Sequence, residues 1–235
     1  MKTELQPLKG KGRTWENFYH TLWVIATVRY VTRKQLNDAF PKAVWCNKCV
    51  TPKILSGLAE RGFLSITEEE VLTATPKAIR LLASCSGYNT DIIRPAEGRG
   101  EGDALQKAEA FLRLLQLPDF FVLFYPEFRK TPRDDQPFLI PDAALVLKRE
   151  NKARIIFLEV ERRKSNWQAH LEGKREKYEV LARDLGTWDE WWRSWCGPLR
   201  LKHCPVEEFS FSVWCLAETR HDWQGWRFLN LEELV

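Results

Sequence analysis

The chain contains the apolar run LIPDAALVL (residues 139–147), which is followed by IIFLEVER (residues 155–162). Both runs are rich in branched side chains and about as long as ordinary β-strands. The segment between them, residues 148–153, is short and polar, so the pattern predicts a β-hairpin. The interpretation of the rest of the chain starts from this hairpin.

Three carboxylates lie in or beside the two predicted strands. Asp142 opens the first strand, and Glu159 and Glu161 end the second on one face, because strand side chains alternate with a period of two. A buried carboxylate is costly unless it is paired or binds a cation. The pattern therefore predicts a site for a hard divalent cation. Its alternative is a solvated Glu-x-Glu face next to a Pro-Asp turn.

The composition is that of a globular protein. The 235 residues are 44% hydrophobic and 29% charged, enough for one large or two small domains. No apolar run approaches the roughly 18 residues that span a bilayer, and residues 1–12 lack the apolar core of a signal peptide. We therefore expect a cytoplasmic protein with no membrane partner.

Positive charge is concentrated in the first part of the chain. Residues 1–95 hold 14 Lys and Arg against 8 Asp and Glu, whereas the remainder holds 22 against 24. A basic first part indicates a polyanionic partner.

The six cysteines are expected to be free thiols in a cytosolic chain. Cys46 and Cys49 have zinc-like spacing, but a complete site would need distant partners such as Cys196, His203 or Cys204. A zinc-stabilised interaction protein is therefore one possible class. Two small side chains facing a helix are the alternative.

Residues 14–86 show the order helix, helix, helix, hairpin, helix. Thr14, Thr32 and Thr51 can each cap a helix, Gly62 ends the third, and Pro76 follows Thr75 at the start of the fourth. The predicted segments are helices from 14, at 32–40, 51–61 and 77–84, and strands at 63–66 and 70–73.

This order resembles a winged helix-turn-helix, in which the third helix lies in the DNA major groove. The resemblance implies six DNA-binding residues, namely Arg33, Lys34, Lys48, Lys53, Ser56 and Arg61. A protein–protein module is the alternative, because the predicted wing at 67–70 is acidic and would be repelled by phosphate.

The predicted domains are a flexible arm at 1–13, the winged helix at 14–86, a linker at 87–102 and a second domain at 103–235. In the second domain Glu109 lies on the apolar side of a helix, and Lys174 and Tyr178 share the apolar face of a helix at 167–184. A snorkelling lysine and a core tyrosine are the alternatives. The tryptophans at 188–195 indicate core or a lid, with base stacking as the alternative.

The second domain resembles the PD-(D/E)xK nuclease fold and, more narrowly, the replication-relaxation family of plasmid and mobile-element proteins. The residues that carry this resemblance are PDA (141–143), FLEVER (157–162) and Lys174 through Tyr178. It implies an α+β chain, in which a winged helix-turn-helix precedes a restriction-endonuclease-like α/β domain.

By this resemblance, Asp142, Glu159 and the Val160 carbonyl would hold Mg²⁺ or Mn²⁺, and Glu109 would hold the metal or its waters. The sequence departs from the superfamily where Glu161 replaces the expected lysine. Lys174 would then supply the missing charge, or Glu161 would bind a second metal. If neither happens, the fold only binds.

The function that follows is a metal-dependent DNA endonuclease or nickase in plasmid or mobile-element replication or transfer. A relaxase route would use Tyr178 as a nucleophile. The competing class is a non-catalytic DNA-binding regulator or replication factor with a degenerate nuclease fold. Expected partners are DNA, a second copy of the chain, or other replication and mobilisation proteins.

Overall fold

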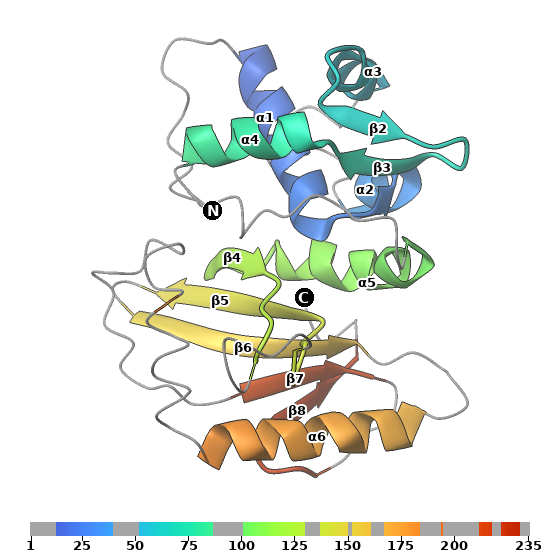
Figure 1. Cartoon of the computed structure of the whole chain (residues 1–235). Coiled ribbons are helices and arrows are strands. Elements are labelled where there is room, and N and C mark those ends of the chain that lie inside the picture. Colours follow the sequence, from blue (N-terminus) through green and yellow to red (C-terminus); the bar gives the residue numbers. More distant parts are fainter. Residues whose placement is uncertain are drawn as a thin grey trace. The chain divides into compact units, whose positions relative to one another are not determined.

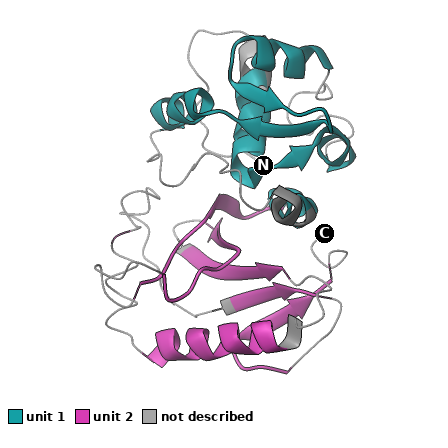
Figure 2. Ribbon diagram, turned by 45° about the vertical axis from the view of Figure 1, so that its right-hand side comes forward, with its two compact units in different colours: residues 1–116 teal, residues 117–235 magenta. Residues whose placement is uncertain are grey.

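The computed structural model describes residues 13–39, 52–86, 101–129, 137–149, 152–160, 167–183, 194, 212–217 and 222–230. The chain has a mixed α+β fold and divides into two compact units, residues 1–116 and 117–235 (Figure 2). Each unit has its own sheet. None of the helices in the described segments is long and apolar enough to cross a membrane.

The first unit combines helices with a small antiparallel sheet of strand order β1-β3-β2 (Figure 1). Its buried side chains come from several helices and from β3. The elements are α1 (Arg13–Val28), β1 (Val31–Thr32), α2 (Arg33–Ala39), α3 (Pro52–Glu60), β2 (Leu64–Ile66), β3 (Val71–Ala74), α4 (Pro76–Ser86) and α5 (Glu101–Leu114).

Local signals in the sequence account for the ends of two of these helices. Thr32 caps α2 in a reciprocal box, in which Gln35 N–H donates to Thr32 Oγ1 (3.1 Å) and Thr32 N–H donates to Gln35 Oε1 (3.0 Å). Gly62, with a φ of 69°, ends α3, and Phe63 N–H donates to the Leu58 carbonyl (2.9 Å). The predicted cap of α2 and end of α3 are confirmed.

Helix α5 belongs to the first unit in the division by contacts, whereas the sequence analysis placed it in the second domain. Leu105 contributes its carbonyl oxygen to a hydrogen bond from Gln35 Nε2 (2.9 Å), which joins α5 to α2. Strand β1, which the sequence analysis did not predict, pairs with β3 through Val31 and Leu72. With only two residues, β1 leaves no readable alternation in the sequence.

The second unit contains one five-stranded sheet of order β4-β5-β6-β7-β8. The strands β4, β5 and β6 are antiparallel neighbours, and β6, β7 and β8 are parallel neighbours. The elements are β4 (Phe120–Phe124), β5 (Ala143–Arg149), β6 (Lys152–Val160), α6 (Trp167–Arg183), β7 (Ser212–Leu216) and β8 (Trp226–Leu229).

The predicted hairpin is present, but its first strand is shorter than the apolar run. Strand β5 begins at Ala143 and pairs with β6 from Ala143↔Leu158 to Arg149↔Lys152. Leu139 forms a separate bridge with Phe128. Pro141 has no N–H to give to a ladder, and it separates these two pairings.

Helix α6 packs on the sheet of its unit (Figure 1). Leu171 lies in a buried cluster with Cys215 of β7 and Phe228 of β8. Tyr178 is fully buried. This packing directs one face of α6 toward Glu159 of β6, which accepts hydrogen bonds from Lys174 and Tyr178.

Candidate active site

Two carboxylates and one ammonium group converge beside the hairpin of the second unit. Asp142 immediately precedes β5, Glu159 lies near the end of β6, and Lys174 comes from α6. Lys174 Nζ forms an ion pair with Glu159 Oε2 and lies 3.8 Å from Asp142 Oδ1. The three side chains are at most 16% exposed, so solvent screens their charges only partly.

Each carboxylate has one oxygen that faces Lys174 and one that accepts a hydrogen bond from elsewhere. Val160 N–H donates to Asp142 Oδ2 (2.8 Å), and the Tyr178 hydroxyl donates to Glu159 Oε1 (2.8 Å). Asp142 N–H also donates to the Leu158 carbonyl (3.0 Å). These bonds fix both carboxylates, so their remaining oxygens are directed toward the same ammonium group.

The backbone N–H of Val160 is a part of this site that the sequence analysis missed. The resemblance implied a role for the Val160 carbonyl, whereas the described contact uses the N–H. The register of β6 against residue 142 decides this contact, and the residue types alone do not reveal it.

Burial dominates the electrostatics of Glu159. Its side chain is 2% exposed, and loss of solvation, reinforced by the negative charge of Asp142, raises the pKa of its carboxyl from 4.5 to about 7. Lys174 and Tyr178 act in the opposite direction. An added positive charge nearby would therefore stabilise the ionised form of Glu159.

Tyr178 is part of the hydrophobic core. Its ring lies 5.8 Å from Phe157 and 5.5 Å from Trp226, measured between ring centroids. Burial, together with the charge of Glu159, raises the pKa of its phenol well above the ordinary value. A buried phenol that resists ionisation is poorly suited to attack DNA, so the geometry favours the core alternative over the relaxase route.

The donor atoms suit a hard cation. Mg²⁺ is commonly bound through one or two carboxylates, with water and substrate phosphates completing the shell. Asp142 and Glu159 supply two such carboxylates. Within the described segments, no three His, Cys, Asp or Glu side chains form a metal-binding group. Glu161 lies outside the described residues, as do Cys46, Cys49, Cys196, His203, Cys204 and the tryptophans at 188–195.

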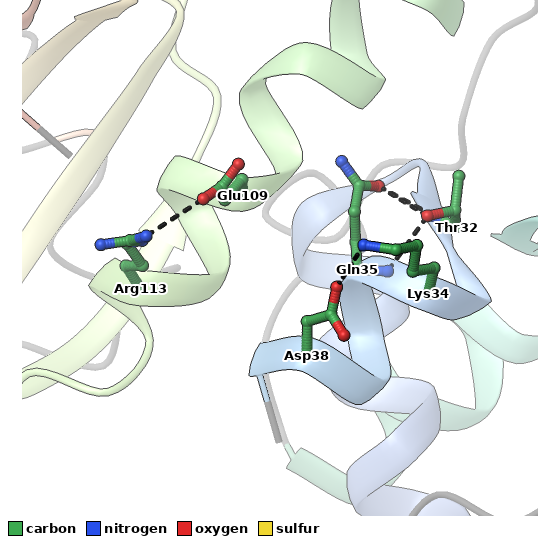
Figure 3. A network of polar contacts seen from close by, with 6 residues as sticks. All are labelled: Thr32, Lys34, Gln35, Asp38, Glu109 and Arg113. Atoms are coloured by element: carbon green, nitrogen blue, oxygen red, sulfur yellow. Dashed lines mark hydrogen bonds and ion pairs between the residues drawn. The ribbon is translucent and has the colours of Figure 1, made fainter. Parts of the chain in front are cut away.

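Glu109 does not point inward as predicted. It lies on α5 of the first unit with its side chain 54% exposed, and Arg113 pairs with it at 3.1 Å (Figure 3). The inward prediction is wrong, because an arginine one helical turn later holds this carboxylate at the surface.

The six predicted DNA-binding residues fall into different environments. Lys53 and Ser56 are exposed on α3, whereas Arg61 folds back, donating to the Gly57 carbonyl (2.7 Å) and lying over the Phe18 ring. Lys48 lies outside the described residues.

Helix α2 carries the other two basic residues. Arg33 pairs with Glu70 (3.4 Å). Lys34 pairs with Asp38 (2.8 Å), and this contact raises the pKa of Lys34 (Figure 3). Both pairs are at least partly exposed, so phosphate can compete with the carboxylates. The first unit thus presents Lys53 and Ser56 on α3, with Arg33 and Lys34 on α2.

Comparison with known proteins gave no match to any protein-family model, curated protein or solved structure.

Proposed function

We propose that the chain is a metal-dependent DNA endonuclease or nickase that acts in plasmid or mobile-element replication or transfer. The observation that carries this proposal is the convergence of Lys174 with Asp142 and Glu159. Two carboxylates with an adjacent lysine are the groups that the PD-(D/E)xK resemblance implies. Here the lysine comes from α6, whereas the superfamily pattern would place it two residues after Glu159.

The architecture of the second unit agrees with this resemblance. Three antiparallel strands precede α6, and β7 then adds to the sheet in parallel with β6. Asp142 and Glu159 lie at the same end of the hairpin because Ala143 pairs with Leu158. This convergence supports the proposal that Asp142 and Glu159 act as metal ligands.

In the proposed chemistry, Asp142 and Glu159 would hold Mg²⁺ or Mn²⁺, and the Val160 carbonyl would be a third oxygen donor. The metal would polarise the phosphate and lower the pKa of a bound water. Lys174 Nζ lies beside the two carboxylates, and from there it can orient a water molecule or stabilise the developing negative charge.

The first unit supports binding to DNA. Its three helices followed by β2, β3 and α4 match the order expected of a winged helix-turn-helix, with β1 completing the sheet. In this interpretation α3 enters the major groove and presents Lys53 and Ser56. The turn between β2 and β3 carries the exposed Glu68 and Glu69, so phosphate contacts are expected from the helices and not from this turn.

The experiment is cleavage of supercoiled plasmid and single-stranded DNA in Mg²⁺ and in Mn²⁺. Wild-type chain should nick DNA, and Asp142→Ala and Glu159→Ala should abolish nicking while DNA binding persists. Glu172→Ala is the matched control, because Glu172 is an exposed carboxylate on α6. Nicking that survives in both site variants would disprove the metal nuclease.

A second candidate is a non-catalytic DNA-binding regulator or replication factor. The observation that favours it is that Lys174 already neutralises part of the charge of the carboxylate pair, as a structural ion pair would. In that case the wild-type chain binds DNA in a salt-sensitive manner without cleaving it, and the site variants lose folding stability only.

A further inference from the structure

We propose that Tyr178 is a positioning residue, which holds Glu159 so that Oε2 is the oxygen directed toward the metal and Lys174. This inference rests on the proposed function, because it assigns a role within the same site. It replaces the nucleophile role that the sequence left open for Tyr178.

The first support is that the two oxygens of Glu159 have different partners. Oε1 accepts the hydrogen bond of the Tyr178 hydroxyl at 2.8 Å, and Oε2 pairs with Lys174. A carboxylate with one oxygen held in this way cannot rotate about its terminal bond without losing a buried hydrogen bond. The bond to Tyr178 therefore fixes the orientation of the carboxylate and leaves its other oxygen available as a ligand.

The second support is the rigidity of the phenol. Tyr178 is fully buried, with Phe157 on β6 and Trp226 on β8 against its ring. Trp226 in turn packs edge-to-face on Trp223 at 5.2 Å. Close-packed aromatic neighbours leave the ring no room to turn, so its hydroxyl has a fixed position relative to the sheet.

The third support is the spacing on α6. Lys174 and Tyr178 are four residues apart, which places them on one face of the helix. One helix therefore contacts both oxygens of Glu159. Asp142 also has one oxygen held by a hydrogen bond and one near Lys174. Val160 N–H donates to its Oδ2, and its Oδ1 lies near Lys174.

The test compares Tyr178→Phe with the wild-type chain, both full length. Phenylalanine keeps the ring and its packing but removes the hydroxyl. Tyr125→Phe is the control, because Tyr125 is a half-buried tyrosine of the same unit and Glu159 receives its phenolic hydrogen bond from Tyr178. Mn²⁺ binding is measured by titration calorimetry without DNA, and nicking kinetics are measured separately.

We expect Tyr178→Phe to weaken Mn²⁺ binding by about 10-fold or more, the usual effect of removing a group that orients a metal ligand. The KM for plasmid should stay within about twofold, and Tyr125→Phe should bind Mn²⁺ like wild type. Equal Mn²⁺ affinity in wild type and Tyr178→Phe would overturn the positioning role, and so would a Tyr178-dependent covalent adduct with DNA.

The two proposals fail in different ways. If wild type binds Mn²⁺, Tyr178→Phe weakens that binding and neither cleaves DNA, the positioning role stands and the nuclease function fails. If the chain cleaves DNA and Tyr178→Phe leaves Mn²⁺ affinity unchanged, the nuclease stands and the positioning role fails. No Mn²⁺ binding by wild type overturns both.

Discussion

Nζ of Lys174, on α6, lies 3.8 Å from Oδ1 of Asp142 and also forms an ion pair with Oε2 of Glu159. One ammonium group thus compensates two carboxylates that would otherwise repel each other in a poorly solvated site. The proposed catalysis would use this arrangement, and a buried ion pair is also expected to affect folding stability. The two roles can be separated by substitutions that remove the charge.

Replacing Lys174 with methionine keeps an unbranched side chain, shorter by one atom, and removes its charge. We expect nicking to fall by about 10²-fold or more, because a proton-holding group at a reacting centre typically contributes that much. The free energy of unfolding should fall by about 3 kcal/mol, since breaking a buried ion pair leaves its partners uncompensated. Nicking assays and urea unfolding measure the two effects.

Lys177→Met is the control for this substitution, because Lys177 is exposed on the same helix. It should leave nicking unchanged within about twofold and shift stability by less than about 0.5 kcal/mol. Equal losses of activity in both variants would argue that Lys174 has no role at the reacting centre.

The raised pKa of Glu159 predicts a pH-dependent stability. Its pKa is about 7 in the folded chain against an ordinary 4.5, so between these values the folded chain retains a proton that the unfolded chain has lost. The contribution of Glu159 to stability is therefore complete below about pH 4.5 and is lost as pH rises through 7. Across this range the loss approaches about 3 kcal/mol.

Glu159→Gln isolates this effect, because it removes the ionisable group at residue 159 and retains Asp142, Lys174 and Tyr178. Urea unfolding in chelator at pH 5, 6, 7 and 8 should show wild type losing stability relative to Glu159→Gln as pH rises. If stability changes with pH in the same way in the two proteins, burial does not raise the pKa of Glu159.

The sequence predicted the elements of the site better than the contacts between them. Period-two alternation and the Pro-Asp pair located Asp142 and Glu159 on a hairpin, and helical spacing put Lys174 and Tyr178 on one face of a helix. Periodicity tells which face is apolar, but not what lies opposite. Which oxygen of Glu159 meets each partner depends on how α6 packs on the sheet.

The differences between the sequence pattern and the observed contacts have equally local causes. Pro141 divides an apolar run that looks continuous, so Leu139 pairs with Phe128 outside the main hairpin. Glu109 lies on the apolar side by helical spacing, yet its pair with Arg113 leaves it exposed. The DNA-binding role of Arg61 stays a prediction, but its side chain folds onto the Gly57 carbonyl. In the last two cases a neighbour one turn away determined the side-chain direction.

Two glycines should respond to alanine in opposite directions. Gly62 has a φ of 69°, and a left-handed conformation costs an L-residue about 1 kcal/mol, so Gly62→Ala should destabilise by about that amount even though its added methyl group meets no atom within 4 Å. Gly173 lies inside α6 with equal space, so Gly173→Ala should stabilise by about 0.5–1 kcal/mol. Thermal unfolding followed by circular dichroism measures both, and shifts of the same sign would contradict this account.

Lys53 and Arg61 should differ in their effects on DNA binding, although both are basic and lie on or next to α3. Lys53 is exposed on the helix, so Lys53→Ala should weaken DNA binding similarly across sequences and reduce the slope of log affinity against log salt by about 1. Arg61 is held by the Gly57 carbonyl and the Phe18 ring, so Arg61→Ala should lower stability with little change in that slope.

Arg80→Ala, an exposed change on α4, is the charge-matched control for Lys53→Ala. Fluorescence anisotropy with labelled duplex DNA between 50 and 300 mM salt gives the slopes, and a Lys53→Ala slope equal to that of Arg80→Ala would exclude α3 as the main phosphate-contacting helix.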